Sequence, residues 1–161
     1  MDRRQLLTAG VIAGVTASAT SSRANDEDDE GLVGSWFGTV TATNPPLGQF
    51  NDLISFHDGG VVIESRRYLV PPPTPFGSLL ETTGHGAWER TGGNTFKAFF
   101  RFLLQNAENG VPIGTDNIRL SLTLDRNART LTGTFESQIK NMADSVQVIV
   151  RGTYTATAIT V

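Results

Sequence analysis

The chain has 161 residues, a net charge of −3 and no cysteine, which fits one domain and excludes a disulfide framework or a thiolate metal site. From Gly31 onward ten basic and ten acidic side chains balance, so the folded part lacks the basic stripe that nucleic-acid binding requires. We therefore expect no nucleic-acid partner.

The first 24 residues (1–24) are typical of a signal peptide. Arg3 and Arg4 precede a mildly apolar run, and residues 22–24 place small side chains at the −3 and −1 positions of a cleavage site. The two arginines, followed by Gln5 and two leucines, resemble the twin-arginine export signal of bacteria. The resemblance implies that the twin-arginine export machinery recognises Arg3 and Arg4 and carries the folded protein to the periplasm or the extracellular space. An ordinary secretory signal and a retained membrane anchor are the alternatives.

An acidic block follows the leader, and we interpret residues 25–33 as a disordered, solvated spacer. The remainder, residues 34–161, alternates apolar and polar side chains in short segments separated by turns rich in Gly, Pro and Asn. The predicted strands cover eight ranges: 34–43, 53–57, 61–69, 84–91, 95–105, 117–125, 130–140 and 146–158.

Short connections between sequential strands favour an antiparallel meander. Eight such strands can close into a barrel, which removes exposed edges and can hold one small ligand. We therefore predict an all-β fold, an eight-stranded antiparallel up-and-down β-barrel. A sandwich of two sheets is the alternative, but no long Greek-key crossover is visible.

The segment 95–105 is the densest aromatic stretch of the chain and the expected central strand. With a period of two, one face is purely apolar, and it consists of Phe96, Ala98, Phe100, Phe102 and Leu104. Phe99 and Leu103 interrupt the polar character of the other face. Either face could line the barrel interior, so the direction of Phe99 is the question that the sequence leaves open.

The residues Gly34-Ser35-Trp36 at the start of the first strand resemble the Gly-x-Trp opening of lipocalins and related calycin barrels. The resemblance implies that Trp36 closes one end of the barrel and that a late basic residue packs over it, with Arg151 as first choice and Arg119 as second. The outline is also similar to that of small bacterial barrel cyclases related to allene oxide cyclase. Both resemblances imply the barrel architecture first and a function second.

The first functional hypothesis is an exported lipocalin-like barrel that binds a small apolar or amphipathic molecule. Small-molecule sites are mostly apolar with a few convergent polar groups. The candidate ligand-binding residues are Trp88, Phe99, Leu103, Tyr154 and Arg66. Core packing and a solvated ion pair are the alternatives for these residues. The proline-rich residues 71–76 could cover a barrel mouth or serve as a passive connection.

The second hypothesis is a cofactor-free isomerase or cyclase of the allene oxide cyclase type, which would act through orientation and one or two acid–base groups. The candidate catalytic residues are His85, Glu89, Glu64 and Tyr68. His57 and His85 form no local metal motif, and no phosphate loop or nucleophile elbow occurs, so we expect neither a metal nor a cofactor. A purely structural or protein-binding module is a third reading, and the oligomeric state stays open.

Overall fold

A computed structural model describes residues 31–67, 69, 70 and 77–160 of the chain. The predicted signal peptide, residues 25–30 of the predicted spacer, Tyr68 and the proline-rich residues 71–76 lie outside the described residues. The described residues contain strands and turns but no α-helix, and hence no helix suited to crossing a membrane.

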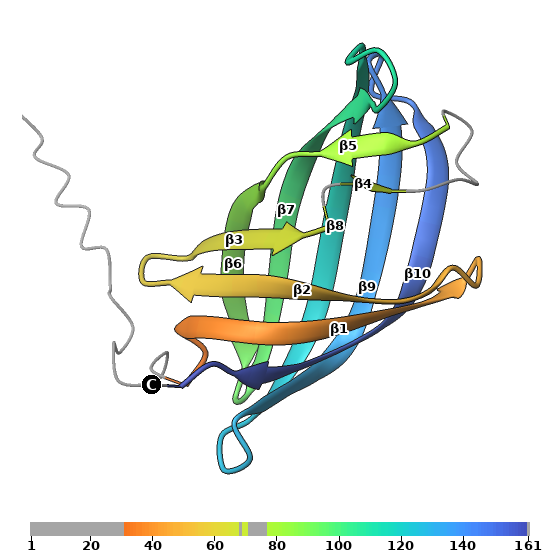
Figure 1. Cartoon of the computed structure of the whole chain (residues 1–161). Coiled ribbons are helices and arrows are strands. Elements are labelled where there is room, and N and C mark those ends of the chain that lie inside the picture. The colour runs from red at the N-terminus through yellow and green to blue at the C-terminus, as the bar shows by residue number, and fades with distance from the viewer. Residues whose placement is uncertain (1–30, 68, 71–76, 161) are drawn as a thin grey trace, which may run out of the picture.

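Ten strand segments form one antiparallel sheet that closes on itself as a barrel (Figure 1). Their bounds are β1 Gly34–Asn44, β2 Gly48–His57, β3 Val61–Arg66, β4 Leu69–Val70, β5 Leu79–Glu81, β6 Gly84–Gly92, β7 Thr95–Asn106, β8 Pro112–Asp125, β9 Thr130–Asn141 and β10 Val146–Ala158. Around the barrel the order is β1, β2, β3, β6, β7, β8, β9, β10 and again β1. Strand β5 pairs with β4 and with the far half of β7, beyond the end of β6. The ten segments therefore fill eight positions.

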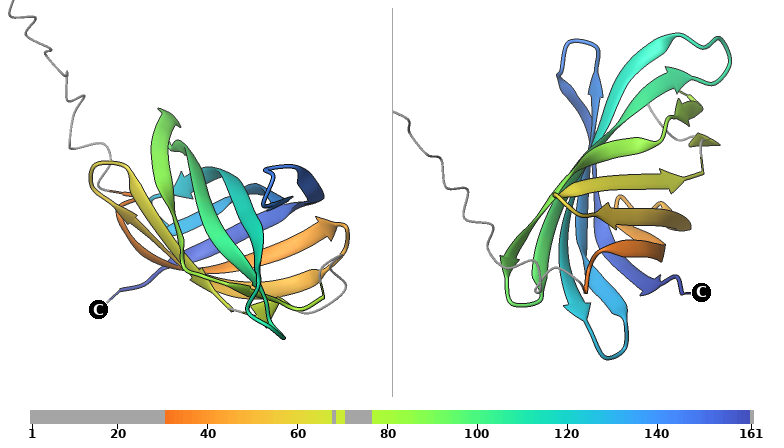
Figure 2. Two further views of the ribbon diagram at one scale, coloured as in Figure 1. Left: turned by 90° about the horizontal axis from the view of Figure 1, so that it is seen from above. Right: turned by 90° about the vertical axis from the view of Figure 1, so that its left-hand side faces the viewer.

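The predicted eight-stranded antiparallel barrel is confirmed, and the strands on its two sides cross at a steep angle (Figure 2). The predicted strand 61–69 is divided, because β3 ends at Arg66 and Leu69–Val70 form the separate segment β4. Three parts of the sheet lie outside the predicted ranges: the beginning of β2 from Gly48, all of β5, and the beginning of β8 from Pro112. Each of these parts places a carboxylate on the inner face, namely Asp52, Glu81 or Asp116. A charged residue at an inner position breaks the apolar alternation from which a strand is recognised.

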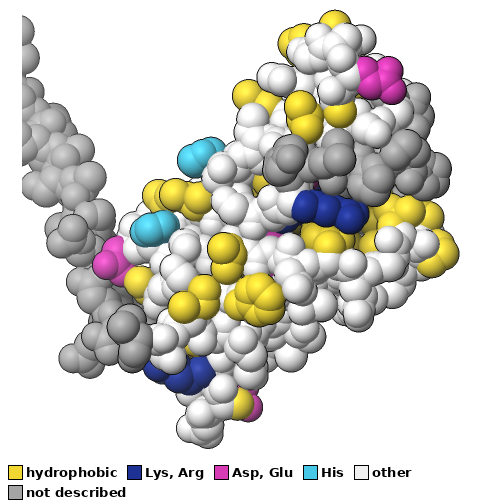
Figure 3. Space-filling model, viewed as in Figure 1, with side chains coloured by type: hydrophobic (Ala, Val, Ile, Leu, Met, Phe, Trp, Pro, Cys, Tyr) yellow, Lys and Arg dark blue, Asp and Glu magenta, His cyan; other side chains and the backbone are white. Residues whose placement is uncertain are grey.

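Strand β7 shows which face lines the interior. Its purely apolar face is inside, since every one of its five side chains is buried, whereas Phe99 and Leu103 are 38% and 57% exposed on the outer wall. The exposed wall also carries other apolar side chains and both histidines (Figure 3). The interior is therefore built from one uniform face of β7, as burial of large apolar side chains favours.

The barrel has two distinct ends. The proximal end contains the turns at residues 58–60, 93–94 and 126–129, and the distal end contains the segments 45–47, 107–111 and 142–145. Aromatic side chains fill the proximal end: the Trp88 ring contacts those of Phe56 and Phe96 edge to face, with centroids 6.0 and 5.9 Å apart. Buried Trp36 lies at this end too, and its indole N–H donates to the carbonyl of Leu32 at 2.9 Å.

The two faces of β7 give the first testable prediction. Phe96→Ala should lower the free energy of unfolding by about 3–5 kcal/mol, because it empties a buried position in the proximal plug. Phe99→Ala should change it by less than about 1 kcal/mol, since that ring lies on the outer wall. Urea unfolding of both variants measures the difference, and equal losses would contradict the assignment of faces.

Candidate functional site

A buried ion cluster crosses the barrel interior, with Arg66 of β3 at its centre. The guanidinium donates from Nε and Nη2 to both carboxylate oxygens of Glu81 on β5, at 2.6 and 2.8 Å. Its Nη2 also donates to Asp116 of β8 at 2.7 Å, and Asp116 accepts a hydrogen bond from the Ser137 hydroxyl of β9 at 2.6 Å. The Arg66, Glu81 and Asp116 side chains are only 10%, 2% and 4% exposed. The cluster thus joins four strands through the lumen.

Apolar rings hold the guanidinium from its faces. The centre of the guanidinium lies 4.3 Å from the centroid of Phe102 and 5.6 Å from that of Phe50. Cation–π contacts of this kind strengthen when they are removed from water. Arg66 is therefore fixed by ion pairs at its edge and by aromatic rings at its faces.

A second set of polar side chains lies next to this cluster and consists of Asp52 on β2, Glu64 on β3 and Tyr154 on β10. Asp52 is paired in register with Arg66, its carboxylate accepts a hydrogen bond from the Tyr154 hydroxyl at 3.3 Å, and it is hydrogen-bonded to the Glu64 carboxyl. Gly38 of β1 makes this meeting possible, because a Cβ atom there would overlap both Asp52 and Tyr154. Glu64 Oε2 is buried, and no donor group among the described residues is hydrogen-bonded to it.

Burial changes the protonation of these carboxyl groups, which together with Arg66, Glu81 and Asp116 form the polar layer of the interior. It raises the pKa of Asp52 from 3.8 to about 6 and raises the pKa of Glu64 well above its usual value, although Arg66 opposes both shifts. A hydrogen bond between two carboxyls needs one proton. This bond lowers the pKa of Asp52 and raises the pKa of Glu64, which places the proton on Glu64. Burial also raises the pKa of Glu81 against the attraction of Arg66. Near neutral pH the layer therefore contains a proton-sharing carboxyl pair.

Apolar side chains border the ion cluster on its distal side. Leu104 is paired in register with Glu81, and Ile139 with Asp116, so each apolar residue points inward beside a carboxylate. Together with Leu79 they form a small buried cluster, against which Ile113 and Val148 pack. This distal apolar cluster is distinct from the large core, although Val148 packs against both. Along β7 and β8 the interior is consequently layered: an aromatic plug, a polar layer, and a small apolar layer at the distal end.

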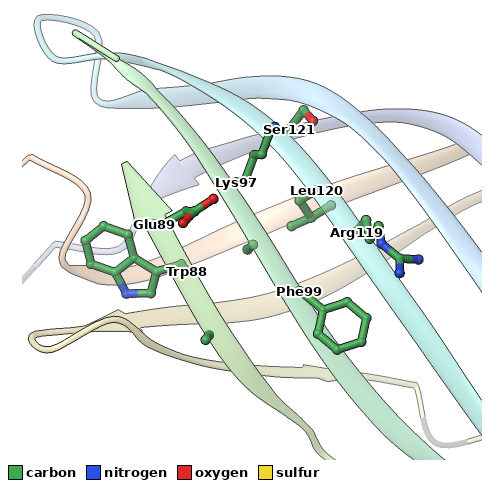
Figure 4. Close-up of a pocket in the computed structure, with 9 residues that line it drawn as sticks. Trp88, Glu89, Lys97, Phe99, Arg119, Leu120 and Ser121 are labelled. Atoms are coloured by element: carbon green, nitrogen blue, oxygen red, sulfur yellow. The ribbon is translucent and has the colours of Figure 1, made fainter. Parts of the chain in front are cut away.

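Two open depressions lie on the outer wall of the described part of the barrel. The first, of about 490 Å³, lies over β6, β7 and β8, where the side chains of Phe99 and Arg119 extend from neighbouring strands (Figure 4). The Arg119 guanidinium stacks on the Phe99 ring at 5.2 Å. The second, of about 540 Å³, lies over β8, β9 and β10 and contains Arg151, which pairs with Glu136 at 2.7 Å. Neither depression reaches the polar layer.

The structure divides the sequence-predicted residues between the two faces of the wall. Among the ligand-binding candidates, Arg66, Tyr154 and Trp88 are inside, and Phe99 and Leu103 are outside. Among the catalytic candidates, Glu64 is inside, His85 and Glu89 are exposed, and Tyr68 lies outside the described residues. The described residues thus bring Arg66, Glu64 and Tyr154 together and leave the others apart.

Sequence reasoning missed Asp52, Glu81, Asp116 and Ser137. Three of them lie in strand segments that the alternation pattern did not reveal, and Ser137 resembled any small residue of a strand. The sequence contains a usable signal at the beginning of β8. Asp116 precedes Ile118 by two residues and therefore falls on the same inner face of the strand. A carboxylate in phase with an apolar face is a signature of a buried polar site.

The pKa shifts predict how stability depends on pH. The folded protein holds protons on Asp52 and Glu64 that the unfolded chain releases, so these groups lose their contribution as pH rises from about 4 through 6 and beyond. Asparagine does not titrate, so the Asp52→Asn variant does not lose the contribution of this carboxyl group as pH rises. The free energy of unfolding of the variant relative to the wild type should therefore increase by roughly 2–3 kcal/mol between pH 4 and pH 7.

Urea unfolding at several pH values measures this difference. Glu136→Gln is the control, because Glu136 lies on the outer wall, where hydrogen bonds from Gln138 and Arg151 lower its pKa. This variant should not show the increase. A constant difference between Asp52→Asn and the wild type from pH 4 to pH 7 would contradict the assignment.

No known family model, curated protein or solved structure matches this chain. In the described part of the chain, no group of three or more His, Asp or Glu side chains is arranged to hold a metal ion. The β-barrel is compatible with a lipocalin-like fold, but Arg151 and Arg119 lie on the outer wall and not over Trp36. The function has to be argued from the layered interior.

Proposed function

We propose that this protein is an exported, lipocalin-like barrel that binds a small amphipathic molecule through its distal end. The observation that carries the proposal is the ion cluster of Arg66, Glu81 and Asp116 directly beneath the distal apolar cluster. A ligand with an apolar body and a polar end matches this order of layers, since small-molecule sites combine apolar lining with a few polar groups.

Energetics support a functional reading of the polar layer. Buried ion pairs contribute little net stability, because the cost of removing the charges from water offsets their attraction. Well-packed apolar residues of the same volume would serve a purely structural barrel as well or better. Charged groups with shifted pKa values inside a cleft or lumen are candidate binding sites for this reason.

The close packing of the proximal plug is the reason for proposing that the ligand enters at the distal end. Trp36, Phe56, Trp88 and Phe96 are all less than one-tenth exposed and belong to one continuous core. Opening a site there would require the rearrangement of close-packed aromatic rings. The distal cluster is smaller and borders connecting segments, which move more easily than a packed core.

The second hypothesis, an isomerase or cyclase, required two of its four candidate residues to meet inside the barrel. Only Glu64 does so among the described candidates, because His85 and Glu89 are exposed. Inside the barrel, Glu64 is hydrogen-bonded to Asp52, which accepts a hydrogen bond from Tyr154, and neither Asp52 nor Tyr154 is one of the catalytic candidates. Binding is the function that the layered interior supports best.

Ligand binding through the distal end can be tested with the neutral fluorescent probe Nile red. Leu104→Trp should reduce its affinity for the protein at least tenfold, because the larger side chain fills the distal apolar cluster. Leu103→Trp is the matched control on the outer face of the same strand and should leave the affinity within twofold. Fluorescence titration measures both affinities, and native mass spectrometry of protein purified from its host should show a bound small molecule.

Two outcomes would contradict the proposal. Nile red binding that is lost in Leu103→Trp and kept in Leu104→Trp would move the site to the outer wall. The absence of saturable binding to the wild type, together with a ligand-free mass, would leave no binding function. Ile139→Phe supplies a milder blocking variant should Leu104→Trp unfold, and thermal unfolding shows whether each variant is folded.

Export is proposed from the leader alone, which lies outside the described residues. Replacing Arg3 and Arg4 together by lysine should abolish appearance of the protein in the periplasm, because the twin-arginine signal depends on both arginines. Arg23→Lys is the control in the same leader. Cell fractionation measures the distribution, and undiminished export of the double variant would favour an ordinary secretory signal.

A further inference from the structure

The polar layer of the lumen contains more acidic groups than basic ones. Four carboxyl side chains are buried there, and Arg66 is hydrogen-bonded among them. A second guanidinium, that of Arg67, lies 5.3 Å from the Phe50 ring, and its charge lowers the pKa of Glu81, so the carboxyls still outnumber the basic groups. Arg90, the other basic residue of the described inner face, stacks on Phe96 at the proximal end. The carboxyls of this layer, which we call the carboxyl layer, are Asp52, Glu64, Glu81 and Asp116.

The carboxyl layer is poorly suited to an anionic ligand. Arg66 already makes three charge-assisted hydrogen bonds to Glu81 and Asp116, at 2.6 to 2.8 Å. A carboxylate or phosphate would have to displace one of these partners and leave it buried without a counter-charge, which is strongly unfavourable. It would also lie close to Asp52 and Glu64. Burial raises the pKa of both, and the negative charges of Asp52 and Glu81 raise the pKa of Glu64 further.

Hydrogen-bond acceptors exceed donors in the same place. Asp52 accepts from Tyr154 at 3.3 Å and shares one proton with Glu64. Glu64 Oε2 is an acceptor that receives no hydrogen bond from the described residues, although Glu64 is only 2% exposed. Buried polar atoms nearly always have partners, so each exception asks for an explanation. A donor supplied by a ligand is such an explanation.

We propose that the polar end of the ligand is a cationic hydrogen-bond donor, such as a primary ammonium group, that the carboxyl layer receives with Glu64 Oε2 as one acceptor. An ammonium supplies three donors and one positive charge, which match the surplus acceptors and the surplus carboxyls. The inference rests on the proposed function, since it specifies the chemistry of the ligand for the same site. It adds that anionic amphiphiles, such as fatty acids, are the wrong class.

Binding of a cation should release a proton. The proton shared by Asp52 and Glu64 neutralises one of the two carboxyls. An ammonium group provides the same neutralisation, and the proton leaves to solvent as the N–H bonds of the ligand take over its hydrogen bonds. The affinity for a cation should therefore rise as pH increases through about 6, the pKa of Asp52, and above it, while the affinity for a neutral molecule should not.

Three probes with one alkyl chain separate the classes: n-decylammonium, n-decanol and n-decanoate, each below its aggregation concentration. Isothermal titration calorimetry of the purified wild-type protein at pH 8 should give an affinity for n-decylammonium at least tenfold above that for n-decanoate. Titration in two buffers of different ionisation enthalpy should show proton release with n-decylammonium only. This comparison needs no variant and does not depend on how a substitution folds.

Glu64→Gln tests the named acceptor. It should weaken n-decylammonium binding at least fivefold and suppress proton release, while n-decanol binding stays within twofold. Glu136→Gln on the outer wall is the matched control and should change neither. Equal or tighter binding of n-decanoate to the wild type would overturn the cation inference and leave the binding function standing. No binding of any of the three probes would overturn the proposed binding function, and this inference with it.

Discussion

The ion cluster around Arg66 constrains the rest of the molecule. A guanidinium inside a barrel needs partners for its donors, and Glu81 and Asp116 supply them in a geometry that includes a bidentate pair. Removing either partner would leave a buried charge uncompensated, so β3, β5 and β8 are held at fixed positions relative to one another. The hydrogen bond from Ser137 extends this constraint to β9.

Charge balance then determines the protonation of the neighbouring side chains. Arg66 is hydrogen-bonded to the carboxylates of Glu81 and Asp116. Its positive charge also lowers the pKa values of Asp52 and Glu64, but by less than burial raises them. Both are buried, so one of them keeps a proton, and the pair becomes sensitive to pH near neutrality. Gly38 is part of the same arrangement, because any side chain at that position would occupy the space of Asp52 and Tyr154. A small residue of β1 and a buried carboxyl group of β2 are thus linked through packing.

The fold could be predicted where the alternation of side chains follows the hydrophobic effect. The segment 95–105 was recognised as a strand, and its apolar face is the inner one because Phe96, Phe100 and Phe102 exclude water more effectively than a mixed face could. The same rule failed at Asp52, since a carboxylate at an inner position is indistinguishable in sequence from a carboxylate of a loop. The partners that make such a residue tolerable come from strands distant in the sequence, and only the closed barrel brings them together.

The proximal end of the barrel shows that the Gly-x-Trp motif can indicate the fold even where the late basic residue does not pack over the Trp. Trp36 does lie in the plug of one end, as the Gly-x-Trp resemblance implies, but its indole donates to the carbonyl of Leu32, and Arg151 lies on the outer wall against Glu136. A basic residue that does pack on the plug is Arg90 of β6, whose guanidinium lies 5.9 Å from the centroid of the Phe96 ring. The buried charges of this barrel are instead placed toward the distal end, where a packed aromatic core would otherwise continue. That asymmetry is the physical reason for assigning stability to the proximal end and recognition to the distal one.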